Sequence, residues 1–194
     1  MARLQYLKRH LQPGQVYRRQ DLARWSSSVD RHLDELLQER TLLKLSGGLY
    51  YYPEQSAFGE VPPKEELVVK KFLNDHRFLL TTPNSYNSLG VGTTQLYNTR
   101  IVYNHKRNGE FAFGNRKFVF RTKPHFPKKI TPEFLLVDLV DNLHLLAEDR
   151  EQVLKKVQTK AASMDRKKLK QAVTRYGGVK AKKILLPILQ QKAA

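Results

Sequence analysis

The chain has 194 residues, 40% of them apolar and 27% charged, which is enough for one medium-sized domain or two small ones. This composition is that of a folded protein rather than a disordered one, and no run approaches the roughly 18 apolar residues that a membrane span needs. There is no cysteine, which excludes disulfides, thiol nucleophiles and thiolate zinc sites.

The chain is strongly basic, with 35 Lys and Arg against 18 acidic residues and a net charge of +17. Residues 1–60 hold only nine basic against seven acidic residues, whereas residues 61–130 hold thirteen against four and residues 131–194 thirteen against seven. Such an excess attracts polyanions, so nucleic acid is the first candidate partner and an acidic protein the second. Basic residues interrupt the apolar residues of the amino-terminal stretch MARLQYLKRHLQPGQ, so we expect no signal peptide and a cytoplasmic protein.

The first 53 residues predict a compact unit of short elements. Leu4, Leu7 and Leu11, at spacings of three and four, predict a first helix, which the sequence QPG ends, and QVYRR is β-like. QDLARW predicts a second short helix. Val29, Leu33, Leu36 and Leu37 then form one face of a third helix, after three serines that suit a helix start. TLLKL and GLYYY, joined through Ser46-Gly47-Gly48, predict a hairpin, and the whole order is that of a winged helix-turn-helix.

The middle of the chain predicts a small sheet. EQSAFGEVPPKEE, residues 54–66, has the Pro, Gly and polar content of a linker that ends in a new helix, and KEELVVKKFLND supplies that helix. RFLLTT predicts a strand, and PNSYNS predicts a short helix after it. Three further strands are predicted by LYNTRIVYN, GEFAFG and KFVFRT, and the last two are joined in a hairpin.

The remainder of the chain predicts helices. Pro132 suits a first helical position, and three more amphipathic segments follow, separated by Ser163-Met164 and Gly177-Gly178. Pro187 should end or kink the last helix. We therefore expect an α+β protein with a winged helix-turn-helix at residues 1–55. A larger α+β domain at residues 62–194 should carry a small mixed or antiparallel sheet over 77–123 and a helical bundle over 131–191.

A helix-turn-helix lays its second helix in the major groove of DNA, which here is the helix at residues 28–39. Arg31 is the best candidate to read a base edge, because a guanidinium can form two hydrogen bonds with guanine. The plainer alternative is a surface ion pair with Glu35, one helical turn away. The predicted DNA-binding set comprises Arg18, Arg19 and Gln20 before the preceding helix, Ser27, Ser28, Arg31 and His32 at the start of the groove helix, and Lys44 and Ser46 on the wing.

A second basic set lies beyond the winged unit. Its members are Lys106, Arg107, Arg116, Lys117, Arg121 and Lys123 around the predicted hairpin, and Arg166, Lys167, Lys168 and Lys170 in the helical region. The hairpin phenylalanines alternate and predict a core face, so the cations between them could line a surface for a nucleic-acid backbone or an acidic partner. A solvated basic rim is the alternative.

The sequence contains few residue patterns that indicate an enzyme. The six histidines have no metal-ligand spacing, so we expect no metal and no cofactor, and the GVG sequence lacks the context of a dinucleotide loop. Asp138 and Asp141 resemble a carboxylate pair on one helix face, although a helix surface is the simpler interpretation. The main hypothesis is therefore a non-enzymatic DNA-binding protein. One alternative is an RNA-binding protein in which the basic second domain makes most of the contacts. The other is a nuclease that uses either aspartate or a histidine.

Two stretches together resemble the AbiEi antitoxins of bacterial toxin–antitoxin operons. The first stretch runs from GQVYRRQDLARW to the end of SSVDRHLDELLQERTLLKLSGGLYYYP. The second is FLLTTPNSYNSLGVGTTQLYNTRIVYN, followed by the basic hairpin. Together the likeness covers roughly residues 1–130. The resemblance implies a winged helix that represses its own operon at inverted repeats, and a second domain that neutralises a nucleotidyltransferase-like toxin without a required stable complex. The family's groove-helix start matches Ser27, Ser28 and Arg31, and its wing matches Lys44 through Gly48. Ser46 and Gly47 stand where such wings commonly carry arginine before glycine.

Overall fold

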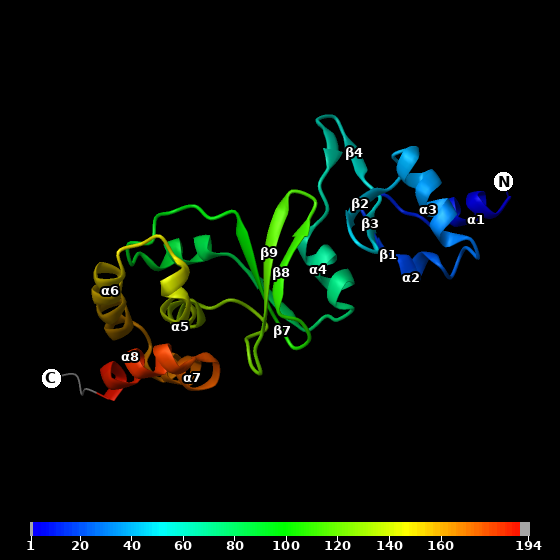
Figure 1. Ribbon diagram of the computed structural model, residues 1–194. Coiled ribbons are helices and arrows are strands. Elements are labelled where there is room, and N and C mark those ends of the chain that lie inside the picture. The colour runs from blue at the N-terminus through cyan, green and yellow to red at the C-terminus, as the bar shows by residue number, and fades with distance from the viewer. Residues whose placement is uncertain (1, 191–194) are drawn as a thin grey trace. The chain divides into compact units, whose positions relative to one another are not determined.

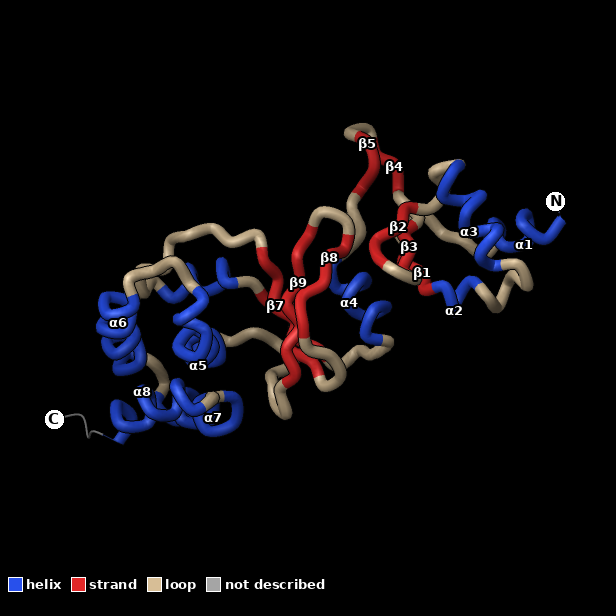
Figure 2. The backbone as a smooth tube through the Cα atoms, in the orientation of Figure 1, coloured by secondary structure: helices blue, strands red, loops and turns tan. Residues whose placement is uncertain are grey.

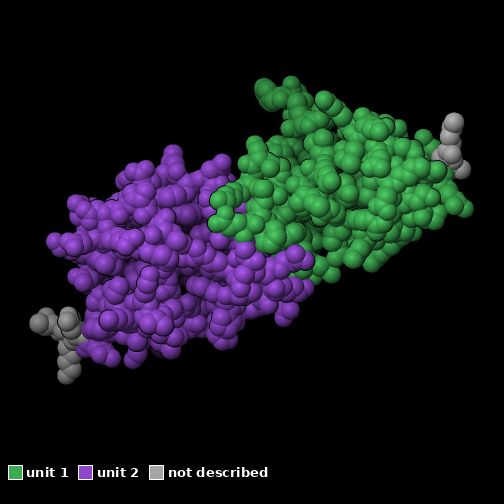
Figure 3. Space-filling view, in the orientation of Figure 1, with its two compact units in different colours: residues 1–76, 110–117 green, residues 77–109, 118–194 purple. Residues whose placement is uncertain are grey.

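The protein has an α+β fold with small sheets and carboxy-terminal helices, as the sequence predicts. The computed structural model describes residues 2–190. The chain divides into two compact units, one of residues 1–76 with 110–117 and one of residues 77–109 with 118–194 (Figure 3). The first unit thus extends to His76, beyond the boundary at residues 55–62 that the composition indicated.

The first unit begins with three helices and a small sheet (Figure 1). The helices are α1 (Ala2–Arg9), α2 (Arg19–Leu22) and α3 (Val29–Gln38), and the strands are β1 (Val16–Arg18), β2 (Leu43–Ser46) and β3 (Leu49–Tyr51). The sheet order is β1-β3-β2, with β3 antiparallel to both neighbours. The predicted hairpin is confirmed, and Gly48 adopts the left-handed conformation (φ 72°) that its turn requires.

The apolar face of α3 forms the centre of this unit's core. Val29, Leu33 and Leu36 are buried against leucines of α1 and α2 and against Tyr50. The spacing of three and four residues places these side chains on one stripe of the helix, so its burial leaves the other side of α3 for polar residues.

The segment predicted as a linker forms a two-stranded hairpin instead. Strands β4 (Glu54–Ser56) and β5 (Gly59–Val61) pair antiparallel, and Figure 2 shows them projecting from the rest of the unit. Helix α4 (Glu65–Leu73) follows, with Val68, Val69 and Leu73 buried. Its packing with the first unit explains why the boundary lies after this helix.

A four-stranded sheet of order β6-β7-β9-β8 occupies the middle of the chain. Its strands are β6 (Phe78–Thr81), β7 (Thr99–Asn104), β8 (Gly109–Phe113) and β9 (Arg116–Thr122), and the 3₁₀ helix η1 (Pro83–Leu89) follows β6. Strands β6 and β7 are antiparallel. Phe113, Phe118 and Phe120 are buried and Phe111 is half-buried, as the alternation predicts.

The second unit ends in four α-helices, which Figure 1 shows together at the carboxy-terminal end of the chain. The elements are α5 (Pro132–Asn142), the 3₁₀ turn η2 (Leu143–Leu145), α6 (Arg150–Ser163), α7 (Arg166–Tyr176) and α8 (Val179–Gln190). Helices α6, α7 and α8 contact α5. Helix α8 does not end at Pro187 but continues through it to Gln190, and residue 191 of the predicted helical region lies outside the described residues. Within residues 2–190, no helix combines the length and the apolar character needed to cross a bilayer.

Candidate nucleic-acid interface

The start of α3 presents a mixture of exposed and buried side chains. Ser27 is exposed and Ser28 half-buried, whereas His32 is only 3% exposed. The His32 Nδ1 atom lies 2.7 Å from the Oγ atom of Ser26, and the same Oγ accepts a hydrogen bond from the backbone N–H of Ser28 at 3.2 Å. The prediction that His32 faces DNA is therefore wrong, because this side chain fixes the turn before α3 from inside.

Arg31 lies on the open side of the same helical turn. Its side chain is 72% exposed, and its Nε atom lies 3.6 Å from the Oε1 atom of Glu35. An exposed pair with this spacing contributes only a few tenths of a kcal/mol, because water screens both charges. The guanidinium can therefore leave Glu35 at little cost when a stronger acceptor arrives.

The three residues at the start of α2 have different surroundings. Arg18 donates to the carboxylate of Asp21 at 2.7 Å, and Lys71 Nζ lies 3.3 Å from the same carboxylate. Burial raises the pKa of Asp21, but the hydrogen bonds from Arg18 and the charges of Lys71 and Arg18 outweigh it and lower that pKa to about 2. Arg18 is thus engaged within the unit, while Gln20 is exposed.

Arg19 neutralises the acidic residue at the start of α3. Its guanidinium donates to both carboxylate oxygens of Asp30, at 2.6 and 2.5 Å. These hydrogen bonds from Arg19 lower the pKa of Asp30, whose charge is therefore retained and paired. A carboxylate that would repel phosphate is in this way compensated by a neighbouring cation.

Two arginines near this helix start were not among the predicted contacts. Arg3 of α1 donates through Nη1 to the Oγ atom of Ser27 at 3.0 Å, and Arg24 is exposed in the turn between α2 and α3. The sequence assigned Arg24 to a helix, but α2 ends at Leu22. Arg3 is 24 residues from Ser27, so only the fold brings it to this site.

The predicted wing carries one exposed cation, Lys44. Ser46 is half-buried, and its Oγ atom has no hydrogen-bond partner among the described residues. The register of β2 and β3 shifts between Lys44 and Ser46. The hairpin thus offers a single positive charge, on Lys44 opposite Tyr50.

The cations of the β8–β9 region do not form one free surface. Arg116 pairs with Glu65 at 2.9 Å and Lys117 with Glu110 at 2.7 Å. Lys106 and Arg107 are exposed, and their backbone N–H groups both donate to Asn104. This distribution favours local ion pairs over a continuous phosphate-binding strip.

Arg121 and Lys123 belong instead to a buried polar network around Asp138, which is 0% exposed. The hydroxyls of Tyr86 and Tyr103 donate to the two oxygens of Asp138 at 2.7 and 2.6 Å, and Lys123 Nζ lies at 3.5 Å. Burial raises the pKa of Asp138, and the charge of Lys123 and the two tyrosine hydrogen bonds oppose that rise. Arg121 donates to the Oδ1 atom of Asn142, and both cations are half-buried, so their charged groups are engaged by this network rather than held free at the surface.

Asp138 and Asp141 do not form a carboxylate pair. Asp141 accepts hydrogen bonds from the backbone N–H groups of Gly178 and Ala181, at 2.7 and 3.0 Å, and so caps the start of α8. With Asp138 buried and Asp141 used as a cap, both the carboxylate-pair and the helix-surface interpretations are wrong. No group of three His, Asp or Glu side chains in the described part of the chain is arranged to hold a metal ion.

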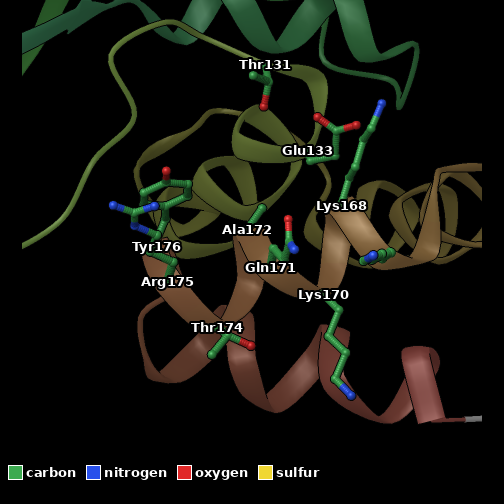
Figure 4. Close-up of a pocket in the computed structure, with 10 residues that line it drawn as sticks. Thr131, Glu133, Lys168, Lys170, Gln171, Ala172, Thr174, Arg175 and Tyr176 are labelled. Atoms are coloured by element: carbon green, nitrogen blue, oxygen red, sulfur yellow. The ribbon is translucent and has the colours of Figure 1, made fainter.

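The basic residues of α7 remain exposed. Lys167, Lys168 and Lys170 line an open groove of about 700 Å³ between α7 and the start of α5, together with Arg175 (Figure 4). Arg166 is also exposed, and its guanidinium donates to the backbone carbonyl of Leu189. Of the second basic set, the three lysines of α7 are thus the members that share one hollow.

Comparison with known proteins gives a likeness of fold. No protein-family model and no curated protein matches the sequence. The chain is similar to the crystal structure of the RV2827C protein from Mycobacterium tuberculosis, with a TM-score of 0.59 and 14% sequence identity over 97% of this chain and 75% of that chain. At this identity the similarity supports the α+β architecture alone.

Proposed function

We propose that the protein is a non-enzymatic DNA-binding antitoxin that represses its own toxin–antitoxin operon. The order helix, strand, helix, helix, hairpin and the sheet order β1-β3-β2 support a winged helix-turn-helix in the first unit. In this proposal α3 enters the major groove, and its leucine face holds it on the core.

The observation that carries the proposal is the exposure of Arg31 at the start of α3. The first turn of a recognition helix is the part that approaches base edges, and an arginine there can bind guanine O6 and N7 together. Arg3 and Arg24 lie near the same helix start and add positive charge for the adjacent phosphates.

The acidic residues of α3 are compatible with a narrow contact. Asp30 is paired with Arg19 and Glu35 lies beside Arg31, whereas exposed Asp34 lies one turn beyond the helix start, outside the proposed contact. DNA contact through the helix start and its flanks therefore avoids placing an unpaired carboxylate on a phosphate. We propose that exposed Gln20 and Lys44 make the remaining contacts with the sugar-phosphate backbone of the DNA.

The antitoxin part of the proposal rests on the resemblance to the AbiEi family. That resemblance implies a nucleotidyltransferase-like toxin encoded beside this protein, with neutralisation that needs no stable complex. Growth rescue on co-expression with the neighbouring reading frame tests this part, separately from DNA binding.

DNA binding is tested on a duplex that carries the inverted repeats upstream of the protein's own gene. We expect tight binding that weakens steeply with salt, and a clear preference over a shuffled duplex. Arg31→Ala should weaken operator binding by roughly tenfold and leave binding to the shuffled duplex nearly unchanged, in line with about 1–3 kcal/mol for a base contact. Arg40→Ala, at the opposite end of α3, is the matched control. Equal losses on both duplexes would remove Arg31 from base reading, and preference for structured RNA over duplex DNA would contradict the proposal.

A further inference from the structure

We propose that the groove between α7 and the start of α5 is a second binding site, which takes a nucleotide whose base is unpaired. This site goes beyond the proposed operator binding, since none of its residues lies on α3. Its ligand is a segment of single-stranded nucleic acid or a free nucleotide, which share the same phosphate and base chemistry.

The cations of the groove are arranged along one exposed helix. Lys167, Lys168, Lys170 and Arg175 occupy two turns of α7, and none forms an ion pair with another described residue. In Figure 4, Lys168 extends toward the side of Glu133, whereas Lys170 extends to the other side of α7. Four cations without carboxylate partners create a local positive potential that attracts phosphate groups from either side of the helix.

The other lining residues offer contacts that a bare phosphate does not need. Glu133 provides a carboxylate that can accept hydrogen bonds from base amino groups, and Gln171 provides an amide that can donate and accept. Tyr176 adds a half-buried aromatic ring, which Phe134 holds edge-on with 5.7 Å between centroids and over which the guanidinium of Arg175 lies at 5.6 Å. Cations, a carboxylate, an amide and an aromatic ring in one groove match a phosphate joined to a base.

The size of the groove and its single carboxylate argue against a duplex as the ligand. A volume of about 700 Å³ lies in the range of sites for small molecules, roughly 300–1,000 Å³. In a duplex the Watson–Crick edges of the bases are paired, and Glu133 would lie close to the phosphates of the backbone. In a single strand the bases are free to reach Glu133 and Gln171, and the phosphates can lie on the lysines.

Fluorescence anisotropy with a labelled eight-nucleotide oligo-A RNA, whose bases carry amino groups, tests the site on the full chain. Lys167→Ala with Lys170→Ala should weaken binding roughly tenfold and reduce the slope of log K against log salt by about 1.4, since each lost phosphate contact of a single strand removes about 0.7. Lys182→Ala with Lys183→Ala is the matched control, because it removes the same charge from exposed positions of α8 outside the groove. Thermal melts establish that both variants are folded.

The comparison ligands are ATP and a blunt eight-base-pair DNA duplex. We expect the oligonucleotide or ATP to bind in a manner sensitive to the groove variant, and competition between the two identifies which source the site prefers. The proposal is overturned if the duplex binds as tightly as the single strand, if both double variants lose affinity equally, or if neither loses any. Arg31→Ala should leave this binding unchanged, so failure here is distinct from failure of the operator proposal.

Discussion

The hydroxyl of Tyr103 donates a hydrogen bond to Oδ1 of Asp138 across 2.6 Å, inside the second unit. The same hydroxyl accepts from the Nδ2 atom of Asn142 at 2.9 Å, and Tyr86 repeats both contacts on the other carboxylate oxygen. The direction of every hydrogen bond is thereby fixed, because Asn142 donates to both tyrosines and both tyrosines donate to Asp138. The arrangement stabilises a carboxylate that water cannot reach.

Replacing Tyr103 by Phe should lower the free energy of unfolding by about 2 kcal/mol, because it removes a donor from a buried carboxylate. Urea denaturation measures the loss, and Tyr6→Phe, at an exposed position of α1, should change stability by less than about 0.5 kcal/mol. Burial raises the pKa of Asp138, so the buried group favours folding less as pH rises through that pKa, whereas the hydrogen bond from Tyr103 favours the charged form and opposes this rise. The Tyr103→Phe loss should therefore be smaller at acid pH than at pH 7, and a loss independent of pH would contradict this account.

Asp21 should make the first unit sensitive to acid. Its pKa of about 2 lies below the ordinary value of 3.8, so its contribution is present above about pH 4 and lost as pH falls toward 2. Asp21→Asn should reduce the free energy of unfolding at pH 7 by about 2 kcal/mol, because each pKa unit corresponds to about 1.4 kcal/mol. The difference from the original chain should shrink as the pH approaches 2, and a constant difference over that range would show that Arg18 and Lys71 do not act through the charge.

Asp141→Ala should loosen the start of α8. It removes the acceptor for the N–H groups of Gly178 and Ala181, at a cost of about 1 kcal/mol. Hydrogen exchange should quicken at the first amides of α8 and not in α6. Asp149→Ala is the matched variant, because Asp149 caps α6 through Gln152 N–H at 3.0 Å, and its effect should be confined to α6. Equal effects of both variants on both helices would contradict local capping.

Glu35→Gln should strengthen operator binding by about twofold. The change releases Arg31 from a pair worth a few tenths of a kcal/mol and removes a negative charge beside the proposed contact. Glu66→Gln, in the first turn of α4, makes the same change of net charge away from α3. Titration of labelled operator DNA compares the two, and equal gains would indicate a general effect of charge.

Residues with periodic apolar neighbours were predictable from the sequence. The leucines of α3 and the glycines between β2 and β3 predicted these elements correctly. A buried helix face requires apolar residues at helical spacing, and a tight hairpin turn favours glycine, so both features can be recognised in the sequence. The strands of the β4–β5 hairpin are mostly exposed, so their sequences lack the alternation of apolar and polar residues that indicates a half-buried strand.

The polar residues were harder to place. His32 follows Val29 by three residues and precedes Leu36 by four, so its helical position already indicated the buried side. Asp138 lies in a helix that is apolar on all sides, which indicates burial of the helix and hence a partnered carboxylate. Its tyrosine partners are 52 and 35 residues away, and only the tertiary fold identifies them.

The most direct test of the central claim is a ¹H–¹⁵N NMR titration of the full chain with the operator duplex. If α3 is the recognition helix, the backbone amides of residues 27–31 should shift most, with smaller changes at Gln20, Arg24 and Lys44. The amides of β4 and β5 serve as an internal reference. Unchanged signals for residues 27–31, with the shifts confined to α7, would contradict DNA recognition by this helix.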